Sequence, residues 1–245
     1  MEELLCDYLN RLEDKHWWFQ GRKKIVLRLL DKYFRKTSGS CVLDIGCGTG
    51  MILKSFSCYG ETLGMDKDLE AISHARLKNP DAKFVLGSFP EESPQTQFDL
   101  ITVLDLLEHL ERDETALIAA AKILKPGGII IITVPAFGFL WSQHDDLNQH
   151  KRRYRLNELK EKIQNAGLSI QKISYYNTFL FLPIVGKKVF DRFFLRRWRP
   201  SPKMGIPELP WLLNIVLEKV FSWERYWLTK MDFPVGVSIV AVAKK

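Results

Sequence analysis

The beginning of the chain combines an amphipathic helix with a buried strand. Over residues 21–34, apolar side chains recur at steps of three and four residues, and lysines and arginines fill most other positions. This spacing places the apolar side chains on one face of a helix. After Ser38-Gly39-Ser40, residues 41–45 form an apolar run that only Asp44 interrupts. Such a run predicts a strand that is buried on both faces.

The same alternation of strand and helix continues along the chain. Further strands are expected at residues 61–65, 83–86, 100–104, 129–134, 168–175 and 237–243, and helices at 51–57, 69–77, 113–124 and 157–166. Strands that alternate with helices pair in parallel, and the helices cover both faces of the sheet. The pattern predicts an α/β, Rossmann-like fold with a seven-stranded, mainly parallel sheet. The segment Lys125-Pro126-Gly127-Gly128 is expected to end the helix at 113–124.

Two segments depart from this alternation. One is a polar loop at residues 141–155, and the other is a stretch rich in Phe, Trp and Pro at residues 179–233. The second is expected to be a helical insertion before the last strand. We expect a single domain with four parts, which are an N-terminal helical lid at 1–38, a core at 39–178, the insertion at 179–233 and the last strand at 234–245.

The composition is that of a globular domain. Of 245 residues, 46% are hydrophobic and 27% are charged, which excludes the disordered and fibrous classes. The first residues carry acids where a secretion signal carries bases, and no apolar run is long enough to span a membrane, so a cytoplasmic protein is expected. The cysteines form no CxxC pair and lack the spaced histidines of a zinc site, so free thiols and no metal ion are expected. They are Cys6, Cys41, Cys47 and Cys58.

The first strand ends in a glycine-rich turn with the sequence Gly46-Cys47-Gly48-Thr49-Gly50. Without Cβ atoms, the glycine N–H groups can approach a ligand closely. The dinucleotide fingerprint GxGxxG is not matched, because Met51 stands in place of its last glycine, which disfavours NAD. Asp66 follows the next strand, where a carboxylate can accept hydrogen bonds from both hydroxyls of a ribose.

These features resemble the class I S-adenosylmethionine-dependent methyltransferases, whose first motif has the form VLDIGCGTG and whose second strand ends in an acid like Asp66. FDLI at residues 98–101 and LDLLEHL at 104–110 resemble the fourth strand and the turn after it, and LKPGG at 124–128 resembles the entry to the fifth strand. The resemblance implies that residues 39–178 bind the cofactor. Asp44 and Gly46 would approach its amino acid part, Asp66 its ribose, and residues 104–106 its methionine side.

The implied cofactor-binding residues are Asp44, Gly46, Cys47, Gly48, Gly50, Asp66, Lys67, Ser88, Phe89, Leu104, Asp105 and Leu106. Ser88 stands where many members have an acid for the adenine amine, and a hydroxyl accepts that hydrogen bond more weakly. Three alternatives remain open. Instead of binding the cofactor, Asp44 would cap the loop and Asp66 would cap a helix. Glu108-His109 would either contact the cofactor or supply the polar residues of a turn that begins a helix.

The loop at residues 141–155 contains the candidate general bases, His144 and His150. Methyl transfer from a sulfonium mainly requires that an acceptor hydroxyl or amine is aligned and loses its proton. Loops at the carboxyl edge of an open α/β sheet bind ligands, and a neutral imidazole accepts a proton near pH 7. Asp145 or Asp146 would orient the ring. The alternative is that the loop is a solvated connection.

The form WSxHDxxxxHxRRY of this loop resembles a bacterial subgroup of these methyltransferases, together with HWWF at residues 16–19 and PxGxS at 234–238. No acceptor can be carried over from that subgroup. The candidate acceptor-binding residues are Trp17, Phe19, Trp141, Arg153 and Tyr154. The HWWF segment either folds over the cofactor as an aromatic lid or packs in the core.

The net charge of +7 arises largely within residues 186–203, where seven bases stand against the single acid Asp191. The bases are Lys187, Lys188, Arg192, Arg196, Arg197, Arg199 and Lys203, and Phe and Trp residues alternate with them. This mixture favours peripheral association with an anionic membrane, at its inner face, or a lipid-linked acceptor. A helical cap over the site and a homodimer interface are alternatives. Nucleic acid is disfavoured because the segment is so apolar.

The leading hypothesis is an S-adenosylmethionine-dependent methyltransferase that methylates a small-molecule or lipid-linked acceptor at oxygen. One alternative is a non-catalytic protein that binds S-adenosylmethionine. Another is a methyltransferase that acts on protein or nucleic acid.

Overall fold

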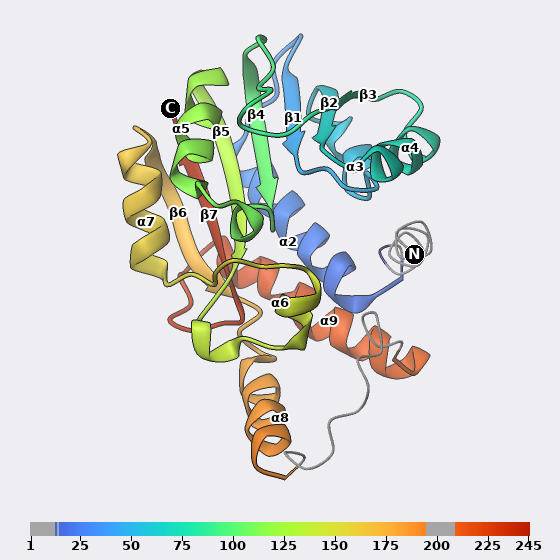
Figure 1. Ribbon diagram of the computed structural model, residues 1–245, viewed down its shortest axis with the longest axis vertical. Helices are drawn as coiled ribbons and strands as arrows, with labels where there is room; N and C mark the ends of the chain where they lie inside the picture. The colour runs from blue at the N-terminus through green and yellow to red at the C-terminus, as the bar shows by residue number, and fades with distance from the viewer. Residues whose placement is uncertain (1–12, 14, 195–208) are drawn as a thin grey trace.

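The computed structural model describes residue 13, residues 15–194 and residues 209–245, which form a seven-stranded sheet of order β3-β2-β1-β4-β5-β7-β6 (Figure 1). The strands are β1 (Cys41–Ile45), β2 (Glu61–Asp66), β3 (Lys83–Leu86), β4 (Phe98–Leu104), β5 (Leu124–Pro135), β6 (Ser169–Tyr176) and β7 (Ser238–Lys244). The helices are α2 (Trp17–Tyr33), α3 (Leu53–Phe56), α4 (Leu69–Lys78), α5 (Asp113–Ile123), α6 (Gln143–Leu147), α7 (Leu156–Asn165), α8 (Phe181–Phe194) and α9 (Trp211–Leu228), with 3₁₀ turns η1 (Leu107–His109) and η2 (Gly138–Leu140). The predicted fold class is confirmed.

Strands β1 to β5 pair in parallel, whereas β7 runs antiparallel to both β5 and β6. The register places Leu43 of β1 between Leu63 of β2 and Ile101 of β4. The chain leaves β1 toward β2 on one side and enters β4 on the other, so the strand order reverses beside β1. Ligands of open α/β sheets bind at such a reversal, beyond the carboxyl ends of the strands.

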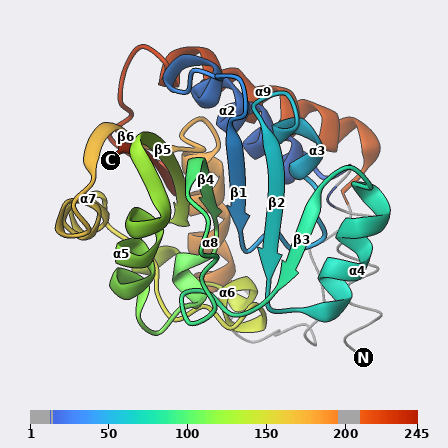
Figure 2. The same ribbon diagram turned by 90° about the horizontal axis from the view of Figure 1, so that it is seen from above.

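Helices cover both faces of the sheet, as Figure 2 shows. The helices α2 and α9 lie side by side over one face, and α5 and α7 lie together over the other. Helix α2 at the start of the described chain and α9 within the insertion therefore share one layer, although most of the sheet lies between them in sequence.

Phe221 of α9 joins these elements. Its ring lies 5.9 Å from the ring of Tyr176 in a stacked arrangement and 5.7 Å from the ring of Trp17 in an edge contact. A Cβ at Gly21 of α2 would overlap the Phe221 ring, so the glycine permits the close approach of the two helices. The second half of the insertion is thus part of the domain core, where Phe221 is fully buried.

Two boundaries differ from the sequence prediction. The helix α2 begins at Trp17 instead of residue 21, because the His16 ring accepts a hydrogen bond from the Trp18 N–H at 3.3 Å and caps the helix. The segment from Lys125 to Gly128 does not end a helix, since α5 already stops at Ile123. It opens β5, where Gly127, with a φ of +81°, donates to the Lys245 carbonyl at 3.0 Å.

Some predicted features lie outside the described residues. These are Cys6, most of the segment before Trp17, and the bases Arg196, Arg197, Arg199 and Lys203 of the insertion. Among the residues that the structure describes, no helix is long and apolar enough to cross a membrane.

Candidate active site

The glycine-rich turn after β1 forms an open cradle at the carboxyl edge of the sheet. Gly46, Gly48 and Gly50 have φ values of +74°, +52° and +75°, a region that favours glycine. A Cβ at Gly50 would lie 2.7 Å from the Asn79 side chain, whereas one at Gly48 would meet no heavy atom within 4 Å. The turn is therefore held tightly against α4 at Gly50 and leaves free space at Gly48. This space fits the close approach that S-adenosylmethionine would require.

Asp44 lies buried in β1 beneath this turn. The Thr102 hydroxyl of β4 donates to its Oδ1 at 2.6 Å. Burial raises the pKa of Asp44 to about 7, although the Thr102 hydrogen bond and the Arg22 charge oppose the shift. A carboxyl group in this position gains from a cationic partner, and the amino group of S-adenosylmethionine is one. The structure thus fits the role that the sequence implies for Asp44.

Asp66 ties the end of β2 to the same turn. Its Oδ2 accepts a hydrogen bond from the Gly48 N–H at 2.8 Å, and its Oδ1 accepts one from the Asp68 N–H at 3.0 Å. Each carboxylate oxygen has a second lone pair, so ribose hydroxyls can still donate to this side chain. Asp68, and not Asp66, caps α4 through the N–H groups of Glu70 and Ala71.

The carboxylate of Asp105 forms polar contacts with two other side chains of the protein. It forms an ion pair with Arg22 of α2 and accepts a hydrogen bond from the Thr133 hydroxyl at 3.0 Å. Its backbone has a φ of +53°, which a non-glycine residue seldom adopts. The Arg22 guanidinium also lies over the Trp18 ring, 4.7 Å from its centroid. The family resemblance implies that Asp105 contacts the cofactor, and the structure adds that its carboxylate links α2 to the end of β4.

The remaining implied cofactor residues occupy different surroundings. Leu104 and Phe89 are buried, while Lys67 and Ser88 are exposed. Leu106 packs so closely on Gly46 that a Cβ there would lie 2.9 Å from it. Cys47 is buried, and burial strongly raises its thiol pKa, so the thiol stays protonated.

A carboxylate lies beside Ser88 even though the sequence offers only a hydroxyl at that position. The Glu92 side chain accepts a hydrogen bond from the Ser88 N–H at 2.7 Å. An acid four residues further along the chain therefore reaches the end of β3, and the sequence motif gave no indication of it.

The loop after β5 is organised around Asp145, which is fully buried. Its carboxylate accepts hydrogen bonds from the Ser142 N–H and hydroxyl, from the His150 ring at 3.0 Å, and from Arg153 at 2.7 and 3.0 Å. Burial by itself would raise the pKa of Asp145, but these donors outweigh burial and hold the pKa well below its usual value. Asp145 is thus a permanent anion that fixes His150 and Arg153. Asp146 instead accepts a hydrogen bond from the Trp141 indole at 2.8 Å.

Four of the five histidines gather in this region. The His150 ring lies 4.7 Å from that of His109 and 6.1 Å from that of His144. His16 is close enough to His144 for the electrostatic interaction between them to lower the pKa of His16. Partial desolvation of its ring by neighbouring side chains lowers the pKa of His144, although the residue still reaches solvent, and burial lowers those of His16 and His109 to about 4. His144 is exposed, whereas His150 is partly covered. The rings of His16, His109 and His144 are therefore neutral near pH 7.

The candidate acceptor-binding residues do not form one group. The Tyr154 side chain is fully buried and its hydroxyl donates to Asp113 at 2.7 Å, so it stabilises the fold. Arg153 is held by Asp145 and by the Ala136 carbonyl, 3.1 Å away. Trp17 packs on Phe221, as described above. Phe19, which lies 5.7 Å from the Arg22 guanidinium, and the exposed Trp141 remain at the surface of the site.

Arg22 is the main residue that the sequence did not single out. On its helix it resembles the other bases of the polar face, but the structure buries it against Asp105. Lys188 of α8 is likewise, in the sequence, only one base of a basic stretch. Its ammonium donates to the carbonyls of Leu140 and Trp141, the latter at 2.7 Å, and so fastens α8 to the loop that carries His144.

Comparison with known proteins finds methyltransferases both among family models and among individual relatives. A family model described as a methyltransferase domain matches residues 7–173, more than half of the chain. An S-adenosylmethionine-dependent methyltransferase of Mycolicibacterium smegmatis is 24% identical over 164 residues, which cover 65% of this chain and 62% of that protein. The ubiquinone biosynthesis O-methyltransferase of Vibrio cholerae is 27% identical over 204 residues, which cover 70% of this chain and 83% of the relative. The chain thus spans less than two thirds of the length of the mycobacterial relative.

Solved structures share the fold. The chain matches an S-adenosylmethionine-dependent methyltransferase of Archaeoglobus fulgidus with a TM-score of 0.59 and 21% identity, over 97% of this chain and 100% of the other. It also matches the [4+2]-cyclase SpnF with a TM-score of 0.63 and 17% identity, over 99% and 93% of the two chains. Because a cyclase has the same architecture, the reaction has to be argued from the site.

Proposed function

Since the chain belongs to the family of methyltransferase domains, we propose that it transfers a methyl group from S-adenosylmethionine to an oxygen atom of a small-molecule or lipid-linked acceptor. The observation that carries the proposal is the open glycine turn at Gly48, which Asp66 holds through a hydrogen bond of 2.8 Å. The names of relatives such as the Vibrio cholerae O-methyltransferase support oxygen as the acceptor atom.

The residues of the turn would hold the cofactor by its polar parts. Asp44 would receive the amino group, Asp66 the ribose hydroxyls, and Glu92 with Ser88 the adenine edge. When bound, S-adenosylmethionine supplies an electrophilic methyl carbon on a sulfonium. Arg22 closes this side of the site by pairing with Asp105, and the Trp18 and Phe19 rings beside it help to exclude water.

The acceptor hydroxyl would lose its proton to His144. This ring is exposed, so an acceptor that enters from solvent reaches it before the partly covered His150. Asp145 holds His150 at 3.0 Å and gives it a fixed orientation, which suits a residue that positions the acceptor. The O–H bond would break with its proton passing to the ring nitrogen, and the oxygen would use the freed electron pair to form its bond to the methyl carbon. The bond from that carbon to the sulfonium sulfur would break at the same time, the sulfur keeping the electron pair, and S-adenosylhomocysteine would leave.

Methyl transfer is tested with S-adenosylmethionine labelled in the methyl group. The purified protein is incubated with separate aqueous and membrane-lipid fractions of a cell extract, and labelled products are identified by mass spectrometry as methyl ethers. The Asp66→Ala variant serves as the control for background transfer. Label in an ether of low mass supports the proposal. Label in protein or nucleic acid overturns the acceptor class, and tight binding of S-adenosylhomocysteine without any transfer indicates a non-catalytic binding protein.

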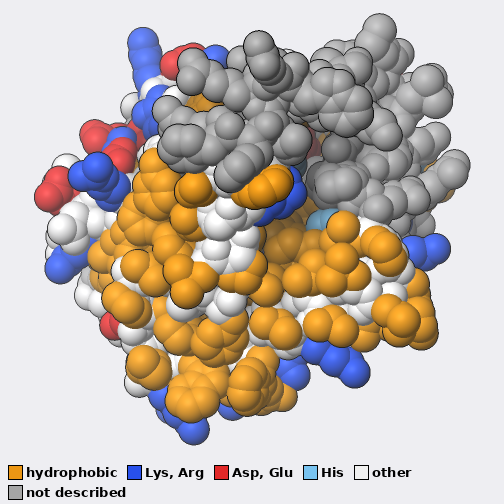
Figure 3. Space-filling view, turned by 90° about the horizontal axis from the view of Figure 1, so that it is seen from below, with side chains coloured by type: hydrophobic (Ala, Val, Ile, Leu, Met, Phe, Trp, Pro, Cys, Tyr) orange, Lys and Arg blue, Asp and Glu red, His pale blue; other side chains and the backbone are white. Residues whose placement is uncertain are grey.

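We further propose that α8 and α9 rest on an anionic membrane surface. Figure 3 shows apolar side chains gathered over the end of the molecule where α8 lies, with lysines and arginines at the margin. We name the exposed apolar residues of α8 and α9 the apolar face, and they include Leu182, Phe190, Trp211, Leu212, Val216 and Trp223. The two acids of α9 do not oppose the bases, since Glu218 pairs with Lys24 at 2.7 Å and Glu224 is buried. Apolar side chains with a basic margin are typical of surfaces that bind anionic lipid.

This arrangement would bring a lipid-linked acceptor to the active site, because Lys188 fastens α8 to the carbonyls of Leu140 and Trp141. The test is sedimentation with vesicles of phosphatidylcholine alone and of phosphatidylcholine with phosphatidylglycerol. Binding to the anionic vesicles should fall at least fivefold in the double variant Trp211→Glu, Leu212→Glu. The matched control is Leu77→Glu, since Leu77 of α4 is 82% exposed outside the apolar face. Wild-type protein that stays unbound, or that dimerises through this face, would contradict the proposal.

A further inference from the structure

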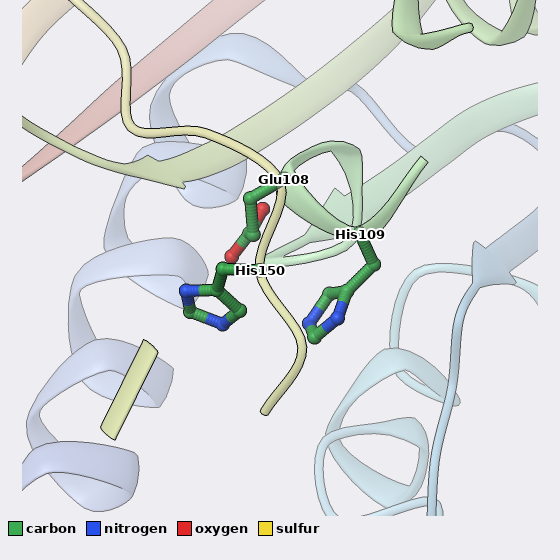
Figure 4. Close-up of side chains that lie close together, drawn as sticks. All are labelled: Glu108, His109 and His150. Carbon is green, nitrogen blue, oxygen red and sulfur yellow. The ribbon is translucent and has the colours of Figure 1, made fainter. Parts of the chain in front are cut away.

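Glu108, His109 and His150 meet at the carboxyl edge of the sheet. The first two come from η1, directly after β4, and His150 comes from the segment between α6 and α7. Figure 4 shows the Glu108 carboxylate next to the His150 side chain and the His109 ring beside the His150 ring. One potential ligand atom of each side chain lies within 4.8 Å of the other two. Residues distant in sequence thus present two imidazoles and one carboxylate to a common point.

Both histidine rings are held by one of their two nitrogens. The Nδ1 atom of His150 lies 3.0 Å from Oδ1 of Asp145, which is itself fixed by Arg153. The His109 ring forms a hydrogen bond to the backbone of Asn148. An imidazole has two nitrogens, so a ring held by one of them has a second that can bind a ligand. Metal-bound histidines almost always carry such a partner, a carboxylate or a backbone carbonyl, on the nitrogen that does not bind the metal.

Glu108 adds an independent observation. The residue is 1% exposed, and its Oε2 has no hydrogen-bond partner among the residues that the structure describes. A buried carboxylate oxygen without a partner is costly to the folded state. The Glu108 carboxyl group belongs to the same cluster as the two imidazoles, and a cation there would satisfy it.

We propose that Glu108, His109 and His150 bind one divalent transition-metal ion. Imidazole nitrogens with one carboxylate suit Zn²⁺, Fe²⁺, Co²⁺ and Mn²⁺, in contrast to Mg²⁺ and Ca²⁺, which prefer sites made of oxygen atoms. The pattern E-H followed by a histidine 41 residues later is no recognised ligand spacing. Nothing in the sequence indicated this site, because the expectation of no metal ion rested on the absence of CxxC pairs and of histidines spaced for zinc.

The role of the ion rests on the proposed function, whereas its binding does not. Three protein ligands leave coordination positions for an acceptor oxygen. A hydroxyl bound to a divalent cation loses its proton more readily, and His144, whose ring lies 6.1 Å from that of His150, can receive that proton. The ion would therefore fix the acceptor oxygen and assist its deprotonation.

Binding is tested without cofactor or acceptor. Protein dialysed against a chelator is titrated with CoCl₂, and the visible absorption of Co²⁺ and the heat of binding are recorded. We expect one equivalent to bind with the absorption typical of nitrogen and oxygen ligands. The exposed Cys58 thiol could bind Co²⁺ adventitiously, but it would give a sulfur charge-transfer band in the near ultraviolet.

Three ligand variants and one control assign the site. Glu108→Gln, His109→Ala and His150→Ala should each weaken Co²⁺ binding at least tenfold, while His74→Ala on α4 should leave it unchanged. Glu108→Gln keeps the buried shape, and its circular dichroism shows whether the fold is retained. The proposal is overturned if the wild type binds no Co²⁺, or if His109→Ala and His150→Ala bind Co²⁺ as tightly as the wild type does. Methyl transfer by protein that binds no Co²⁺ would refute the metal site alone, whereas Co²⁺ binding without any methyl transfer would count only against the proposed function.

Discussion

The Gly48 N–H donates a hydrogen bond to Oδ2 of Asp66, 2.8 Å away, and so joins the turn after β1 to the end of β2. The two residues lie 18 positions apart, Gly48 in the turn after β1 and Asp66 at the end of the neighbouring parallel strand β2. One contact therefore couples the open cradle to the carboxylate that would receive the ribose. Substitutions at either residue should lower the affinity for the cofactor, but for different reasons.

Asp66→Ala should weaken the binding of S-adenosylhomocysteine by roughly 1 to 3 kcal/mol, because the ribose would lose charge-assisted hydrogen bonds and the turn would lose its tie to β2. Isothermal titration calorimetry measures the change. Asp68→Ala is the matched control, since Asp68 lies two residues further on and caps α4. An unchanged dissociation constant for Asp66→Ala would remove this residue from the cofactor site.

Gly48→Val should abolish detectable binding of S-adenosylhomocysteine while the protein remains folded. The side chain would fill the space that is free at Gly48, and it would also strain a backbone with a φ of +52°. Gly39→Val separates these two effects, because Gly39 has a φ of +75° and also has open space around its Cβ position. Gly39→Val should cost stability alone. Normal binding by folded Gly48→Val would reject the turn as the cofactor cradle.

Most of the sheet was predictable because its central strands are apolar and buried, although the edge strand β3 is mostly exposed. All seven expected strands are observed with shifts of a few residues, since an apolar run such as Ile129 to Val134 leaves no other location than the middle of a covered sheet. The glycine turn and Asp66 were predictable for a similar reason. Their chemistry is set by local sequence, and the parallel strand order then brings both to one edge.

Long-range pairing was not predictable. Arg22 and Asp105 are 83 positions apart, and nothing in the helix pattern distinguishes Arg22 from the neighbouring bases until α2 reaches the end of β4. Likewise, residues 179–233 were expected to form a separate insertion, yet Phe221 lies in the core because Gly21 makes room for it. Such contacts depend on the packing of distant elements, which periodicity within one element does not encode.

Tyr154→Phe should lower the free energy of unfolding by about 1 to 2 kcal/mol without affecting cofactor affinity, because the buried hydroxyl donates to Asp113 at 2.7 Å. Burial by itself would raise the pKa of Asp113, but hydrogen bonds from Lys162 and Tyr154 outweigh it and hold the pKa below its usual value. This contribution is therefore present at neutral pH and is lost as the pH falls through the lowered pKa. Urea unfolding at pH 7 measures the loss, and Tyr226→Phe, at an exposed hydroxyl, is the control. A large loss of cofactor affinity in Tyr154→Phe would contradict a structural role.

Glu224→Gln should stabilise the protein at pH 8 and leave its stability nearly unchanged at pH 5. The side chain is fully buried in α9, and burial raises its pKa from 4.5 to about 7, although the N–H groups of residues 177–179 donate to it. The folded protein therefore retains a proton that the unfolded chain releases, so this contribution to stability is complete below pH 4.5 and is lost as the pH rises through about 7.

Glutamine carries no charge, so it would avoid a penalty of up to roughly 3 kcal/mol, the free energy that corresponds to such a change in pKa. Thermal unfolding at the two pH values measures the difference between variant and wild type. Glu218→Gln is the matched control on the same helix, since Glu218 forms a surface ion pair with Lys24, and surface pairs contribute little at either pH. If Glu224→Gln is less stable than the wild type at pH 8, the Phe179 N–H, which lies 2.8 Å from Oε1, and its neighbours stabilise the ionised carboxylate more than burial destabilises it.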